Sequence, residues 1–482
     1  MSSLPSHGKP DARGHGSGAI AVAAGLLALA ALSGQLVETY RFYAWVERAN
    51  TLIPATVLVA SAIVFFFRIR RGPESLFMPL PWFAVSCAVY FGIGASAKVF
   101  ATAESNEFSS CLYRIDDVGV LRTNVLNAVA LAIVFMTHAL VALRLPELPP
   151  PRGTPNPWRL IIVLAVFTIP IKYGLLVPYE LGLLSFVPPT SIAAFGSATR
   201  LVMFLLWDVT LGGRKRVFPL ALAFTFVELA VALISHAKIE VLTVLFMVAL
   251  AIYMHRPRIS TIAACGSVAA VTYFLLVPYV TEARMVLSDR SDKGLSSRIE
   301  ASLDATERHG SFAPDERQQG WWTRLDYTNA QAFAMDMYDR GSPGRTYEEI
   351  PQLFVPRFIW LDKPVVLYGA QFNRLATGTD TSSTAPGVFA EGYWNFGWPG
   401  VTFTCLYIGA ILAILEKFAS TFLRVRDFRW LPCGSYAVQL GLRPDHWFGP
   451  AYVVGLAVSF VYLVIILLLV PSNDSATRGA PA

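Results

Sequence analysis

The sequence predicts an all-helical, multi-pass membrane protein with about eleven or twelve transmembrane helices and one large loop outside the cytoplasm. Three observations carry this prediction. Hydrophobic residues make up 54% and charged residues 15% of the 482 residues, and the mean hydropathy is +0.50, which leaves too few charges to cover a soluble surface. Apolar runs of the length that crosses a bilayer core recur along the chain. Basic residues cluster in alternate connections between these runs.

Twelve apolar segments are candidate spans, and each is expected to be helical because backbone polar groups in lipid must be hydrogen-bonded within the segment. They are residues 19–37, 51–67, 79–99, 122–143, 159–178, 187–211, 217–234, 239–254, 259–279, 399–417, 431–442 and 450–470. The eleventh is short. Residues 1–18 are predicted to form a disordered cytoplasmic tail, 19–279 a bundle of about nine helices, and 399–482 the last helices and a short tail.

The basic residues also predict the orientation. Five alternate loops contain Arg68, Arg70 and Arg71; Arg144, Arg152 and Arg159; Arg214, Lys215 and Arg216; Arg256 and Arg258; and Lys417, Arg424, Arg426 and Arg429. The intervening short loops are poorer in Lys and Arg. By the positive-inside rule, the N-terminus lies in the cytoplasm and residues 280–398 lie outside. The net charge of +6 therefore reflects topology, and no nucleic-acid partner is predicted.

The outer stretch 280–398 is different in kind from the rest of the chain. A connection of this length between compact elements is usually functional or disordered. Its second half, 321–398, is too rich in aromatic residues for a disordered tract. Residues 324–340 are predicted to form a short helix and 341–346 a turn. The first half, about 285–318, is more polar and is predicted to be a mobile flap.

Several ionisable residues fall in or at the ends of predicted spans, where charges are costly and usually functional. They are Lys98, Lys172, Arg200, Glu228, Lys238 and Glu240. Most lie toward the outer half of the bilayer, with Arg200 nearer the middle of its helix. A basic pocket at that depth suits an anionic lipid head group such as a diphosphate. The alternative is that Lys98 and Lys238 reach the interface independently and Glu228 pairs with a neighbouring cation.

The loop contains a second group of polar and aromatic residues. They occur in the segments Trp321–Tyr327, Pro356–Pro364, Gln371–Arg374 and Glu391–Trp398. Arginine presents a fork of donors to phosphate oxygens, aromatic faces stack on sugars, and a carboxylate can act as general base on a hydroxyl. This chemistry suits transfer on a phosphorylated carbohydrate, with Glu391 as candidate base because it lies where loop meets membrane. The alternative is an ordinary interfacial segment with aromatic belt residues and surface ion pairs.

Some motifs are absent from the sequence. It has no G-x-x-x-x-G-K-[ST] phosphate loop and no H-E-x-x-H motif, so neither an ATP-driven pump nor a zinc protease is indicated. The seven histidines show no metal-ligand spacing, and the five cysteines are scattered, which indicates no disulfide framework. We therefore expect neither metal nor cofactor.

The order of motifs in the outer loop resembles a known family. Trp-Trp-x-Arg-x-Asp-Tyr, then Val-Pro-Arg-Phe-Ile-Trp-x-Asp-Lys-Pro, then Ala-Pro-Gly and Glu-x-Tyr-x-Asn-Phe-Gly-x-x-Gly resemble the bacterial oligosaccharide repeat-unit polymerases, which make O-antigen and exopolysaccharide. The resemblance is strongest over 321–410, and the segment Ser235–Leu242 also looks similar. Two departures are Leu361, where the family has proline, and His236, where it has a small or polar residue.

The resemblance implies a fold, a place and a reaction. The fold is of the membrane glycosyltransferase class C type, in a multi-pass protein of the bacterial inner membrane. A growing glycan on undecaprenyl diphosphate moves onto a new undecaprenyl-diphosphate-linked repeat unit on the periplasmic side, and undecaprenyl diphosphate leaves. Such enzymes are metal-independent, need no cofactor, and commonly work with a chain-length regulator protein.

The resemblance also assigns residues to roles. The candidates for binding diphosphate are Arg324, Arg357, Lys363 and Arg374, with Lys238 and Arg200. Glu391 or Asp326 would orient or deprotonate the acceptor hydroxyl. The candidates for contacting sugars are Tyr393, Trp394, Asn395 and Trp360.

Three other readings stay open at this point. An O-antigen ligase shares the topology and the arginine chemistry but passes the glycan to a different acceptor. A transporter or flippase for lipid-linked oligosaccharide has a similar number of helices, although such proteins usually place their charges near the bilayer midplane. A non-catalytic assembly subunit is the third.

Overall fold

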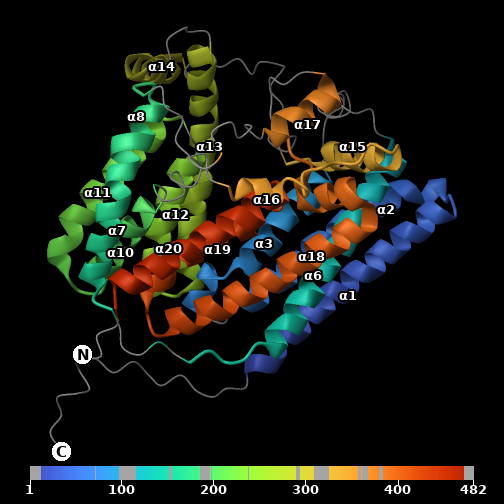
Figure 1. Ribbon diagram of the computed structural model, residues 1–482, viewed down its shortest axis with the longest axis horizontal. Helices are drawn as coiled ribbons and strands as arrows, with labels where there is room; N and C mark the ends of the chain where they lie inside the picture. The colour runs from blue at the N-terminus through green and yellow to red at the C-terminus, as the bar shows by residue number, and fades with distance from the viewer. Residues whose placement is uncertain are drawn as a thin grey trace, which may run out of the picture.

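The computed structural model describes residues 12–70, 72–96, 116–149, 151, 155–184, 196, 198–236, 238–288, 294–308, 325–355, 360, 367–378 and 384–471. Every regular element within these ranges is helical (Figure 1).

The helices of the first half are α1 (Ala12–Thr39), α2 (Tyr43–Ile69), η1 (Pro73–Phe77), α3 (Pro79–Cys87), η2 (Ala88–Gly94), α6 (Asp117–Arg144), α7 (Pro157–Ile171), η3 (Lys172–Leu176), α8 (Val177–Glu180), α10 (Thr199–Leu211), η4 (Lys215–Val217) and α11 (Phe218–Ile234). Those of the second half are α12 (Lys238–His255), α13 (Ile259–Ser288), α14 (Leu295–Arg308), α15 (Thr328–Asp339), α16 (Ile350–Leu353), α17 (Tyr368–Thr377), α18 (Gly387–Arg424), η6 (Phe428–Trp430), α19 (Leu431–Gly441), η7 (Gly449–Val454) and α20 (Gly455–Leu469).

The protein is a multi-pass helical membrane protein. Seven helices of the described part are long and apolar enough to cross a bilayer. They span Ser17–Thr39, Tyr43–Ile69, Asp117–Arg144, Pro157–Glu180, Lys215–Ile234, Gly387–Arg424 and Gly449–Leu469. Shorter apolar helices occupy Pro79–Gly94, Glu240–His255 and Ser260–Leu276, and α10 and α19 are shorter still. The total of eleven or twelve spans therefore stays a prediction.

The long helix α6 packs against α1, α2 and α18, and α7, α10, α11, α12 and α13 form a second group (Figure 1). The helices α14–α17 lie toward the same end of the bundle, which we call the loop face, with α14 beside α13 and α15 on α18 (Figure 1). At the opposite end, Arg426 of the α18–η6 turn donates to Asp208 near the end of α10 at 2.5 Å. The basic turns 212–217 and 425–430 thus share this opposite face.

Two predicted boundaries differ from the structure, the start of the first helix and the end of α13. The helix α1 begins at Ala12, within the tail predicted to be disordered. At the loop, α13 continues to Ser288, and α14 (Leu295–Arg308) is a helix within the stretch for which a mobile flap was predicted. It packs on α11 and α13, and a ring nitrogen of His236 lies 2.9 Å from Ser302 Oγ. The remainder of 285–318 lies outside the described residues.

The span predicted to begin at 399 is part of a longer helix. The helix α18 begins at Gly387 and contains 38 residues. Its backbone is non-helical at Phe396 and at Gly397, where φ is 62°. Such a φ favours glycine, and Pro399 follows without an N–H to donate. The kink therefore divides α18 into a short segment, 387–395, at the loop face and a long membrane-crossing segment.

Candidate functional site

Glu391 lies at the centre of the loop face, in the short first segment of α18. Only 1% of the residue is exposed. One carboxyl oxygen accepts a hydrogen bond from Thr346 Oγ1 at 2.6 Å, and the other accepts from the backbone N–H of Phe448, also at 2.6 Å. The carboxyl group thereby joins three segments that are distant in sequence. It lies in a buried helical segment that runs directly into the membrane-crossing part of α18.

Asn395 lies one helical turn after Glu391, on the same face of α18. Its Nδ2 donates to Thr346 Oγ1 at 2.9 Å and to the Glu391 carbonyl at 2.8 Å. Its Oδ1 accepts from the Tyr347 backbone N–H at 3.2 Å. The side chains of Glu391 and Asn395 together hold the segment 346–347 in place.

Tyr347 extends the same contact into the membrane-crossing segment. Its hydroxyl lies 2.5 Å from Thr404 Oγ1, and its ring stacks on Phe448 at a centroid distance of 5.0 Å. Burial raises the pKa of Tyr347 well above its ordinary value, and the nearby Glu391 raises it further. The phenol therefore stays a neutral hydrogen-bonding group at physiological pH.

Tyr393 lies apart from these contacts, against α6 and α15. Its hydroxyl donates to Asp339 Oδ1 at 3.1 Å. The other oxygen of Asp339 accepts from Arg122 Nη2 at 2.6 Å, and Arg122 Nε lies 3.4 Å from Glu38. This network links α1, α6, α15 and α18. The sequence reading did not select Arg122, because a single arginine at the first residue of a span is typical of interface residues.

A cluster of aromatic rings covers the outer side of α18. Phe372 of α17 lies 5.3 Å from the ring of Trp394 and 5.9 Å from Trp447, between ring centroids. Tyr368 packs on Trp447 at 5.5 Å. Trp394 is buried, and its indole N–H donates to the Ser342 carbonyl at 3.2 Å. These rings dock α17 on the bundle, while Trp360 is 36% exposed.

The Arg-x-Asp-Tyr motif reaches the bundle at the end of η2. A Cβ atom at Gly94 would lie 2.0 Å from the Leu325 carbonyl oxygen, so glycine is needed for this approach. Asp326, which precedes the N-cap residue Tyr327, accepts through Oδ1 from the Thr328 N–H at 2.8 Å at the start of α15. The Tyr327 hydroxyl donates to Asp445 Oδ2 at 3.2 Å.

Asp445 is a residue that the sequence reading missed. It lies in the connection 442–448 between α19 and η7, four residues after α19 ends at Gly441. Val388 N–H donates to the Pro444 carbonyl at 3.0 Å, which fixes this connection against the start of α18. Burial raises the pKa of Tyr327, and the nearby Asp445 raises it further. The phenol therefore keeps its proton and donates a hydrogen bond to Asp445.

The predicted basic pocket is found in part. Lys172 Nζ lies 2.5 Å from Glu228 Oε2, and the Tyr173 hydroxyl donates to the other oxygen at 2.7 Å. Arg200 pairs with Glu240 and lies within electrostatic range of Glu228. Arg200 is the second residue of α10. Each cation here has an acidic partner, as the alternative reading expected for Glu228.

The other predicted cations are placed less fully. Arg374 is exposed on α17. Arg324, Arg357, Lys363 and Lys98 lie outside the described residues, as does the side chain of Lys238.

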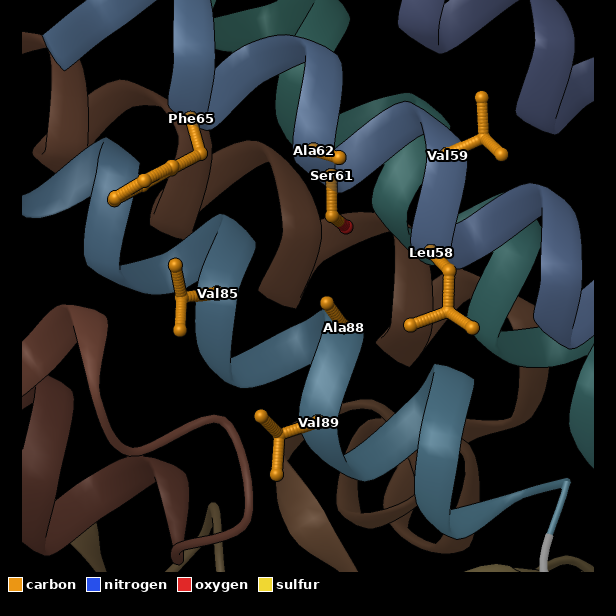
Figure 2. A pocket seen from close by; sticks show the side chains of 8 residues that line it. All are labelled: Leu58, Val59, Ser61, Ala62, Phe65, Val85, Ala88 and Val89. Atoms are coloured by element: carbon orange, nitrogen blue, oxygen red, sulfur yellow. The ribbon is translucent and has the colours of Figure 1, made fainter. Parts of the chain in front are cut away.

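One apolar groove of about 430 Å³ opens between α2 and the α3–η2 segment (Figure 2). Its lining residues are Leu58, Val59, Ser61, Ala62, Phe65, Val85, Ala88 and Val89. The only polar side chain among them is Ser61, so the groove offers hydrocarbon contact and no reacting group. In the part of the chain that the structure describes, no three His, Cys, Asp or Glu side chains gather as metal ligands would.

Comparisons of this chain with models of known families, with curated proteins and with solved structures find no match.

Proposed function

We propose that this protein is a membrane glycosyltransferase of class C type that polymerises lipid-linked oligosaccharide repeat units at its loop face. The observation that carries the proposal is the convergence of the loop motifs. Tyr327 and Glu391 come from segments far apart in sequence, and both contact the connection 442–448, Tyr327 through Asp445 and Glu391 through the Phe448 N–H.

The composition of this face suits a glycan attached to a lipid. Aromatic rings for sugar stacking and carboxylates for hydroxyl groups lie where a lipid-linked substrate would present its head group. In this proposal Glu391 and Asn395 hold the loop in position. Trp360 and Arg374, both at the surface, contact sugar or diphosphate together with the loop cations Arg324, Arg357 and Lys363. Undecaprenyl diphosphate is the leaving group, and its charge is neutralised by these cations.

A transporter or flippase for lipid-linked oligosaccharide is the second candidate. Paired charges within membrane helices often mark a transport pathway. Lys172–Glu228 and Arg200–Glu240 are such pairs, and Arg68 lies 2.5 Å from Glu416, which also contacts His138 at 2.9 Å. A ligase would use the same face as a polymerase and differs only in its acceptor.

The test is incubation of the purified protein with undecaprenyl-diphosphate-linked repeat units, with and without chelator. A polymerase produces a ladder of longer lipid-linked glycans and releases undecaprenyl diphosphate in both conditions. A ligase consumes the donor only when its separate acceptor is added, and a flippase changes the leaflet of the lipid without changing its length.

A further inference from the structure

Asp445 differs from the other acidic residues of the loop face in what its oxygens contact. Oδ2 accepts the Tyr327 hydroxyl at 3.2 Å. Oδ1 is shielded from solvent and has no hydrogen-bond partner among the residues that the structure describes. An unsatisfied buried oxygen costs free energy and requires an explanation. A hydrogen-bond donor supplied by a ligand would remove that cost.

The other two acids already have structural partners. Glu391 accepts from Thr346 and from the Phe448 N–H, so both its oxygens are occupied. Asp326 accepts from the Thr328 N–H at the start of α15. A general base must lie within hydrogen-bond reach of the proton it abstracts. Glu391, enclosed on all sides, does not offer this.

The surroundings of Asp445 allow a substrate to approach. The residue as a whole is partly exposed, and its neighbours Arg443 and His446 are exposed. The terminal torsion of an aspartate is broad, so a small rotation brings Oδ1 toward the exterior. Tyr327, which holds the opposite oxygen, also packs edge-on against Tyr90 of η2 with 5.3 Å between ring centroids. The Tyr90 ring thus helps to hold Tyr327, and the Tyr327 hydroxyl orients the carboxylate.

We propose that Asp445 is the general base of the transfer reaction, oriented by Tyr327, an inference that rests on the proposed function. Asp445 Oδ1 takes the proton of the acceptor sugar hydroxyl. The acceptor oxygen bonds to the anomeric carbon of the donor glycan, and the bond from that carbon to the diphosphate oxygen breaks. The lipid diphosphate leaves with the electron pair, and the protonated Asp445 then returns its proton to water.

The experiment measures kcat and KM of the purified protein in liposomes with undecaprenyl-diphosphate-linked repeat units. Asp445→Asn keeps the size of the side chain and removes the base, so kcat falls by about 10²–10⁴-fold while KM is unchanged. The matched control is Asp336→Asn on α15, at the same face but paired with Arg340, and its kcat stays within about twofold of wild type.

Tyr327→Phe gives an independent measurement should Asp445→Asn fail to fold. Loss of its hydrogen bond to the carboxylate lowers kcat on the order of tenfold without raising KM. The inference is overturned if Asp445→Asn folds and keeps kcat within about threefold of wild type, or if it does not fold and Tyr327→Phe keeps wild-type kcat. Wild-type protein that elongates nothing would instead refute the proposed function itself.

Discussion

Replacing Glu391 by alanine removes the acceptor of two buried hydrogen bonds, from Thr346 Oγ1 and from the Phe448 N–H, each 2.6 Å long. A buried donor left without its acceptor costs about 1–3 kcal/mol. With two such donors, Glu391→Ala is expected to lower the free energy of unfolding by about 2–6 kcal/mol. This loss is a large share of the stability of a typical domain.

The free energy of unfolding of Glu391→Gln should lie between those of Glu391→Ala and the wild type. The glutamine oxygen can still accept from Phe448, but its amide group then faces Thr346 Oγ1, which already accepts from Asn395. One hydrogen bond is lost, so we expect a destabilisation of about 1–3 kcal/mol. In a double-mutant cycle with Thr346→Val, the coupling energy should be about 0.5–3 kcal/mol.

The assay is unfolding in mixed micelles with increasing SDS, followed by tryptophan fluorescence. Glu348→Ala is the matched control, because Glu348 is exposed in the neighbouring segment and its loss should change the stability by no more than about 0.5 kcal/mol. If Glu391→Ala unfolded at the same SDS concentration as Glu348→Ala, the hydrogen bonds of Glu391 to Thr346 and Phe448 would not stabilise the fold as argued.

Three further variants test other contacts. Gly94→Ala forces a Cβ atom against the Leu325 carbonyl, so it should destabilise the protein by about 1–3 kcal/mol and speed proteolysis of the loop; unchanged proteolysis would contradict this contact. Gln331→Leu leaves the amide of Asn127 unpaired and should cost about 1–3 kcal/mol in the SDS assay, most of which is recovered when Asn127→Leu is added. Arg357→Ala should lower polymer formation about 10²–10³-fold while the protein stays in the membrane, and full-length polymer from that variant would exclude its role.

The sequence predicted the helical membrane architecture because the bilayer imposes it. Apolar segments of sufficient length must be helical in lipid, and all seven qualifying helices overlap predicted spans. The short helix predicted over 324–340 is α15, at Thr328–Asp339. It was recognisable because its sequence contains helix-forming residues between turn residues.

The first segment of α18 was not predictable in the same way. Glu391–Trp398 contains three glycine or asparagine residues among bulky aromatics, a composition typical of loops. It is helical because its polar side chains find partners in distant segments, such as Thr346 for both Glu391 and Asn395. Tertiary contacts here override local preference.

Asp445 was missed for a related reason. It is a lone acid in a short connection after the weak segment 431–442, and its sequence neighbourhood gives no motif. Only the fold brings it to Tyr327, more than a hundred residues earlier. The acidic partners of Arg200 and Arg122 could not be predicted for the same reason, because the pattern within one helix does not show which acidic residue of another helix it contacts.

The most direct measurement of the central claim is elongation in sealed vesicles of known orientation. Ser342, exposed at the loop face, is replaced by cysteine, and vesicles are sorted by whether a membrane-impermeant maleimide reaches it. Undecaprenyl-diphosphate-linked repeat units are then added to the outer leaflet. We predict a ladder of longer lipid-linked glycans only in vesicles whose loop face is outside. Elongation in the opposite orientation alone, or in neither, would contradict a polymerase that works at the loop face.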